Sequence, residues 1–205
     1  MRCVNCGAFS LRTICAACAA NLAECRLSMR QVEGFSVFYY YGYSEIREFI
    51  LSKHHEYGAA VFARIASLSL AKFPLHLQRK ISVHPQNYET FKTDGVFKFN
   101  AVPLDDDARS GYSHTAILAR ALKSKLIEPK FHCLRAQNRV KYTGQSLEFR
   151  LKHKRNFKIL TPPQFPVILV DDIITSGLSM LQARESLIDG GFMPVCGLVL
   201  ANAKE

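Results

Sequence analysis

Hydrophobic positions near the C-terminus form two short, continuous runs separated by a segment with helical spacing. The runs PVILVDD (166–172) and PVCGLVLA (194–201) predict buried strands of a parallel sheet. Between them, LSMLQARESLIDGG (178–191) predicts a helix that ends at a glycine pair. This strand–helix–strand order favours an α/β fold with a central parallel sheet.

Earlier residues repeat the alternation of strand-like and helical patterns. We expect strands at 35–43 and 96–104 and helices at 44–53, 58–73 and 113–126. Ser44 and Ser113 are the expected N-caps, and Pro74 is expected to stop the second helix. Residues 75–95 show a less regular pattern. After about residue 30 the sequence changes from a cysteine-rich segment to an aromatic, strand-like run. This change predicts a small unit at 1–30 followed by one larger domain at 31–205.

Composition is that of a globular protein with a real core. Of 205 residues, 48% are hydrophobic and 21% are charged. No apolar run approaches the roughly 18–20 residues of a membrane-spanning helix. The first residues, MRCVNCGAFS, lack the pattern of a signal peptide. We therefore expect a cytoplasmic protein without a membrane span.

The net charge of +10 is concentrated in one stretch. Residues 120–158 hold twelve Lys and Arg against two acids, whereas the rest of the chain holds fifteen of each sign. Such a block favours a polyanionic partner, either nucleic acid or pyrophosphate, over an ordinary solvated face. On a helix Arg150 and Lys154 share one side, and the predicted DNA-binding set is Arg150, Lys152, Lys154 and Arg155. Stacking of bases on exposed residues among Tyr39–Tyr43 is a minor alternative to core packing.

Four of the seven cysteines lie within the first eighteen residues, as two Cys-x2-Cys pairs: Cys3, Cys6, Cys15 and Cys18. In a cytoplasmic protein this spacing indicates metal rather than disulfides. Four thiolates complete a tetrahedral zinc site that has no open position, so the predicted Zn²⁺ is structural. About thirty residues bury too little to fold unaided, which makes the metal the main source of their stability.

The segment VILVDDIITSGLSM carries the strongest candidate chemistry. A buried strand delivers Asp171 and Asp172 at its carboxyl end, where open α/β sheets bind ligands. The following loop offers hydroxyls, a glycine and the N-terminus of a helix, which together suit a phosphate. The two carboxylates suit the hydroxyls of a ribose and a hydrated Mg²⁺.

These residues resemble the phosphoribosyl-pyrophosphate (PRPP) motif of type I phosphoribosyltransferases. The resemblance implies a phosphoribosyltransferase-like fold in which Asp171 and Asp172 contact the ribose of PRPP. The residues that it assigns to the 5′-phosphate are Thr175, Ser176, Gly177, Leu178 and Ser179.

Residues 3–201 as a whole resemble the ComF (competence protein F) family, also called GntX. The matching features are the four cysteines, YYYGYSEIREFILSKHH with Lys53, VPLDDDARSGYSH, Gln145, and the pair Arg155 and Asn156. The chain departs from the family pattern at Ser110, at Ser113 and His114, and at an acidic triplet, 105–107. Three carboxylates there repel pyrophosphate unless a metal ion intervenes, and an exposed acidic turn explains the triplet equally well.

The family resemblance implies a competence protein that binds incoming single-stranded DNA on the cytoplasmic side and carries a PRPP-Mg²⁺ site. Other DNA-uptake proteins are implied partners. Two alternatives remain open from the sequence: a phosphoribosyltransferase that acts on an unknown acceptor, and a regulator that senses PRPP.

Overall fold

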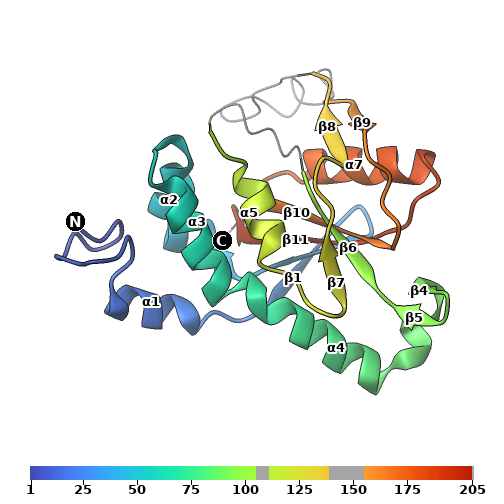
Figure 1. The fold of residues 1–205 in the computed structure, drawn as a ribbon, viewed down its shortest axis with the longest axis horizontal. Helices are drawn as coiled ribbons and strands as arrows, with labels where there is room; N and C mark the ends of the chain where they lie inside the picture. Colours follow the sequence, from blue (N-terminus) through green and yellow to red (C-terminus); the bar gives the residue numbers. More distant parts are fainter. Residues whose placement is uncertain (105–110, 139–154, 205) are drawn as a thin grey trace.

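The computed structural model describes residues 1–104, 111–138 and 155–204 (Figure 1). A seven-stranded sheet has the order β1-β2-β11-β10-β6-β7, and the short strand β3 also pairs with β11. Its strands are β1 (Ser28–Val32), β2 (Phe35–Tyr39), β3 (Tyr41–Gly42), β6 (Phe99–Pro103), β7 (Ile127–Pro129), β10 (Val167–Ile174) and β11 (Pro194–Asn202). Within this sheet β1 pairs antiparallel and the other pairings are parallel. The predicted α/β class with a central, mostly parallel sheet is confirmed.

Both faces of the sheet are covered. The larger core joins one face to α1 (Ala16–Ala23), α2 (Tyr43–Leu51), α3 (Gly58–Leu68), α4 (Phe73–Val83) and α5 (His114–Arg120). The second core joins the opposite face to α7 (Leu178–Asp189) and to the hairpin of β8 (Leu134–Ala136) and β9 (Phe157–Ile159). Ile168 and Val170 face the first core, and Val167 and Leu169 face the second. This two-sided burial explains why the strand is apolar without interruption.

Two N-cap residues were predicted, and one of them is confirmed. Ser113 caps α5 and accepts a hydrogen bond from the Ala116 N–H at 3.1 Å. Ser44 is not the cap of α2, because that helix begins at Tyr43. There the Glu45 carboxylate accepts a hydrogen bond from the Gly42 N–H at 2.7 Å, which satisfies the helix start without a serine.

Pro74 does not stop a helix; it lies in the first turn of one. Helix α3 ends at Leu68, and the short 3₁₀ helix η2 (Leu70–Lys72) leads into α4. Proline fits a first turn because its missing N–H has no helical partner there. Residues 75–83, expected to be less regular, therefore belong to a regular α-helix. After α4 come the 3₁₀ helix η3 (Pro85–Phe91) and a hairpin of β4 (Lys92–Thr93) and β5 (Val96–Phe97).

Strand β1 was not predicted. It forms a hairpin with β2 through Glu33 and Gly34, both with positive φ, as a tight two-residue turn requires. The side chains of Tyr39, Tyr40 and Tyr41 are all buried, so these three do not provide a surface for base stacking.

The cysteine-rich N-terminal segment packs against the larger core through residues that include Ile14, Cys18 and Leu22. The Tyr41 hydroxyl donates to the Leu22 carbonyl at 2.8 Å. Within the described ranges one stretch, Gly58–Val83, is long and apolar enough by length and composition to cross a membrane, a test that buried core helices also pass. In this chain that stretch comprises α3, η2 and α4.

Candidate functional site

The carboxyl end of β10 lies at a switch point of the sheet. From β6 the chain crosses through α5 to β7 on one side, and from β10 it crosses through α7 to β11 on the other. The two crossover helices belong to the cores on opposite faces. Open α/β sheets bind ligands in the crevice at such a point. Asp171 and Asp172 stand there, after four fully buried apolar residues.

Asp172 is held in a buried ion pair. Its Oδ2 lies 2.8 Å from the ammonium of Lys53, which comes from the 3₁₀ helix η1 (Ser52–His54). The Asp172 side chain is only 6% exposed and that of Lys53 is 25% exposed. Burial acts to raise the pKa of Asp172, but the charges of Lys53 and His114 outweigh it and the pKa lies below its usual range. Asp172 is therefore a fixed negative charge already compensated within the protein.

Asp171 differs in its environment from its neighbour. It is half-buried, and its Oδ1 accepts a hydrogen bond from the Asp172 N–H at 2.8 Å. Burial and the charge of Asp172 raise the pKa of Asp171 to about 8, although Arg155 and Lys53 act in the opposite direction. A ligand that supplies hydroxyl donors or positive charge relieves this unfavourable pair of adjacent carboxylates.

His114 completes a cluster that the sequence did not predict. It is the first residue of α5, and its Nε2 lies 3.7 Å from Asp172 Oδ2. One ligand atom from each of His114, Asp171 and Asp172 lies within 4.8 Å of the other two, which is close enough for the three residues to share one metal ion. The sequence signal was Ser113-His114, a departure from the pattern of the ComF family that the chain resembles, but nothing in the spacing related it to residues 171–172.

The predicted phosphate loop lines a small hollow beside Asp171. Residues 173–180 surround it. The first N–H groups of α7 have no partner within the helix, and they lie at the helix N-terminus that borders this hollow. An anion is favoured at such a position. Arg30 on β1 fixes the loop from outside by donating to the Thr175 carbonyl at 2.9 Å and to Asn202 Oδ1 at 3.1 Å.

Gly177 has two reasons to be glycine. Its φ is +88°, and a Cβ there would lie 2.5 Å from Cγ1 of Val32. Val32 is buried and β-branched, so its side chain cannot rotate away easily. The backbone of the phosphate loop therefore packs directly on β1.

We expect Gly177→Ala to lower the free energy of unfolding more than Gly191→Ala does. Gly191 has a φ of +81°, but a Cβ added there would meet nothing within 4 Å, so it reports backbone strain alone, about 1–2 kcal/mol. The contact with Val32 adds roughly 1–3 kcal/mol. Urea unfolding of both variants measures the difference, and equal costs would contradict the close packing of this loop.

The four predicted zinc ligands lie together. One sulfur atom from each of Cys3, Cys6, Cys15 and Cys18 lies within 4.8 Å of the others, and Cys6 Sγ is 3.7 Å from Cys15 Sγ. Sulfurs bound tetrahedrally at about 2.3 Å from one Zn²⁺ lie about 3.8 Å apart. The residues therefore fit a structural zinc ion.

Hydrogen bonds to sulfur support the same interpretation of this cluster. The Cys15 N–H donates to Cys3 Sγ at 3.3 Å, and Asn5 Nδ2 donates to Cys18 Sγ at 3.4 Å. Although burial opposes them, backbone N–H groups lower the pKa of the Cys3 thiol to about 6. Against the Asn5 hydrogen bond, burial and the three other sulfurs raise the pKa of Cys18 to about 12. A bound divalent cation offsets the unfavourable interaction among the four sulfurs and so allows Cys18 to ionise as well.

The predicted DNA-binding set is only partly within the described residues. Arg150, Lys152 and Lys154 lie outside them, as does the acidic triplet 105–107. Arg155 is half-buried, its backbone N–H donates to Gln182 Oε1 at 3.0 Å, and its charge acts to lower the pKa of Asp171. The positive charge of its guanidinium therefore favours the ionised form of Asp171.

No family model matches the chain, and no curated protein matches it. The functional argument therefore depends on the geometry at the end of β10 and on the sequence patterns. Two sites follow from this argument. One is the four-cysteine cluster near the N-terminus, and the other is the cluster of Asp171 and Asp172 with Lys53 and His114 at the carboxyl end of β10.

Proposed function

We propose that this chain is a PRPP-binding protein of the ComF kind, with a type I phosphoribosyltransferase-like fold, which handles single-stranded DNA on the cytoplasmic side during natural transformation. One observation carries the PRPP site. Asp171 and Asp172 lie near the carboxyl end of the central strand β10 at a switch point of the sheet. Two residues later the strand leads into a loop that packs through Gly177 and opens α7.

The chemistry of this edge suits a phosphorylated ribose. In the proposal, the N–H groups and hydroxyls of residues 175–179 take the 5′-phosphate, and the two carboxylates accept hydrogen bonds from the ribose hydroxyls. Lys53 and Arg155 add positive charge near an anionic ligand. The half-buried carboxylate of Asp171 fits a hydrated Mg²⁺, which borrows few protein ligands and would travel with the pyrophosphate.

The same site supports two alternative uses, transfer of ribose 5-phosphate to an unknown acceptor and sensing of PRPP. Both need the 175–179 loop and the two carboxylates. Titration calorimetry with PRPP and Mg²⁺ tests the site itself. Release of pyrophosphate in the presence of an acceptor then separates a transferase from a protein that only binds.

The DNA part of the proposal is supported by the charge block at 120–158. We expect Arg150→Gln, Lys152→Gln and Lys154→Gln together to weaken binding of a single-stranded oligonucleotide. Each phosphate neutralised on a single strand contributes about 0.7 to the slope of logarithmic affinity against logarithmic salt concentration. The triple variant should therefore flatten that slope by up to about 2, measured by fluorescence anisotropy across a salt series.

Arg155 is tested separately, because it lies against α7 near Asp171. Arg155→Gln should weaken PRPP more than DNA. A matched control replaces Arg47, Arg79 and Lys80, exposed basic residues outside the charge block, by glutamine. If this control lowers DNA affinity and slope as much as the triple variant does, the block has no special role in DNA binding.

A further inference from the structure

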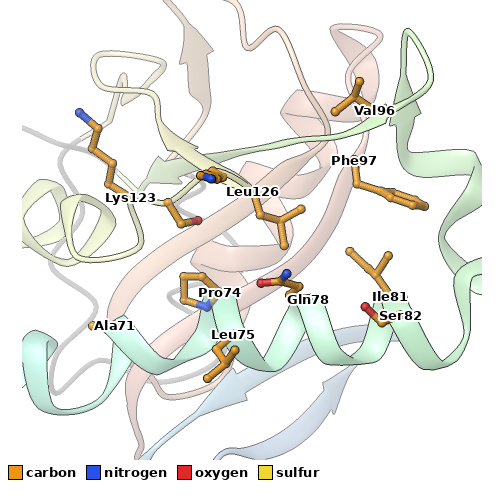
Figure 2. Close-up of a pocket in the computed structure, with 12 residues that line it drawn as sticks. Ala71, Pro74, Leu75, Gln78, Ile81, Ser82, Val96, Phe97, Lys123 and Leu126 are labelled. Atoms are coloured by element: carbon orange, nitrogen blue, oxygen red, sulfur yellow. The ribbon is translucent and has the colours of Figure 1, made fainter.

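A long groove lies at the amino ends of β6 and β7, the opposite end of the sheet's parallel strands from Asp171. It runs between α4 and the segments that lead into these strands and has a volume of about 650 Å³ (Figure 2). Figure 2 shows Gln78 and Ile81 on α4 facing Leu126 and Phe97 across it. The groove is thus separate from both the phosphate loop and the cysteine cluster, and it goes beyond the function proposed above.

One wall of the groove is a helix face. Its members share helical spacing and are Ala71, Pro74, Leu75, Gln78, Ile81 and Ser82. The opposite wall contributes Val96, Phe97 and Leu126. Leu75 is 53% exposed and Val96 is 60% exposed, so the two walls together present apolar side chains to solvent along the groove.

The rim of the groove carries charge of one sign. Lys123 and Lys125 are exposed on it, and none of the twelve lining residues is acidic. An occupant that matches this surface has apolar groups toward α4 and carboxylates toward the lysines.

The shape of the groove selects the occupant. It follows η2 and α4 from Ala71 to Ser82, roughly 16 Å at 1.5 Å per residue. That length matches about three turns of a helix laid alongside, the geometry of helix-in-groove recognition. We propose that this groove binds an amphipathic, acidic helical segment of a partner protein.

The test uses a synthetic probe peptide of about fourteen residues, with Leu at positions i, i+3, i+4 and i+7 and Glu beside them, and a second peptide with Lys in place of every Glu. We expect saturable binding of the Glu peptide by fluorescence anisotropy. Leu75→Asp with Val96→Asp should weaken it at least about tenfold, which is the effect of losing central apolar contacts. Both side chains are exposed, so these changes leave the fold intact.

Reversing the charge of the two rim lysines gives the most specific test of the proposed occupant. Lys123→Glu with Lys125→Glu should weaken the Glu peptide and strengthen the Lys peptide. The matched controls on α4 are Val83→Asp and the pair Arg79→Glu with Lys80→Glu, which lie outside the groove lining and should change neither affinity.

Three results would overturn the proposal. The first is absence of saturable binding of the Glu peptide, and the second is equal affinity for the two peptides in every variant. The third is evidence for a different occupant. If laurate displaces the Glu peptide at a concentration lower than the peptide itself needs for binding, the groove binds an acyl ligand. Likewise, self-association that Leu75→Asp abolishes in sedimentation velocity indicates a second copy of this chain.

Discussion

Protein carrying Cys6→Ser is expected to leave purification without zinc, whereas the unaltered protein retains about one Zn²⁺ per chain. Cys6 is the exposed member of the four-cysteine cluster, so its replacement removes a ligand with little change in packing. Three thiolates with a neutral hydroxyl in the fourth position hold zinc far less tightly, because the ion prefers a full set of charged sulfurs. Elemental analysis of both proteins measures the loss.

The loss of zinc should also lower the stability of the whole chain. Structural zinc contributes about 10–16 kcal/mol to the folding of isolated zinc-finger peptides. Here the cysteine-rich segment shares the larger core with α2 and α3, so its unfolding exposes Ile14 and Leu22 and the surface beneath them. We expect a lower urea midpoint for Cys6→Ser and for the parent protein after chelation.

Cys25→Ser is the matched control for this experiment. Cys25 is half-buried and lies close to Leu68 and Lys72 rather than among the four sulfurs. It should keep its zinc. Unaltered zinc content in Cys6→Ser, or loss of zinc in Cys25→Ser, would show that the ligand set has been assigned wrongly.

The second large effect is expected at the end of β10. Above pH 8, where Asp171 is ionised, Asp171→Asn and Asp172→Asn should each weaken PRPP binding by roughly tenfold to hundredfold, since a hydrogen bond to a charged group contributes about 1.5–3 kcal/mol. The double variant should show no detectable binding in calorimetry. Asp189→Asn, an exposed acid at the end of α7, is the control that should bind normally.

The two single variants should differ in stability. Asp172→Asn leaves the Lys53 ammonium without its buried partner, which costs several kcal/mol when one member of such a pair is removed. Asp171→Asn removes a carboxylate whose charge is opposed by burial and by Asp172, so it should cost little or stabilise at neutral pH. Asp171→Asn is therefore the cleaner probe of ligand binding, and an equal loss of stability in both would contradict the described roles.

Sequence patterns predicted the central part of this fold well because the relevant signals are local. The apolar runs around β10 and β11, the helix between them and the Cys-x2-Cys spacing each arise within a few neighbouring residues. Pro74 was misinterpreted because a proline stops one helix and begins another with equal ease. The pattern around Ser69, where α3 gives way to η2, contains no glycine or proline to mark the break.

The missed parts of the site depend on contacts between distant segments. Lys53 and Asp172 are 119 positions apart, and His114 reaches the same carboxylate from the start of α5. Val32 explains Gly177 only once β1 is placed in the sheet beside β2. Such pairings follow from strand order, which local hydrophobic periodicity does not specify.

Titration of the unaltered protein with PRPP in the presence and absence of Mg²⁺ is the most direct test of the central claim. The geometry at β10 predicts saturable binding of one PRPP per chain that ribose 5-phosphate competes for, because both ligands place the same phosphate on the 175–179 loop and the same hydroxyls on the carboxylates. Pyrophosphate alone, which lacks the ribose, should compete less well. Absence of saturable binding under these conditions, or binding that persists unchanged in the Asp171→Asn and Asp172→Asn double variant, would contradict the account.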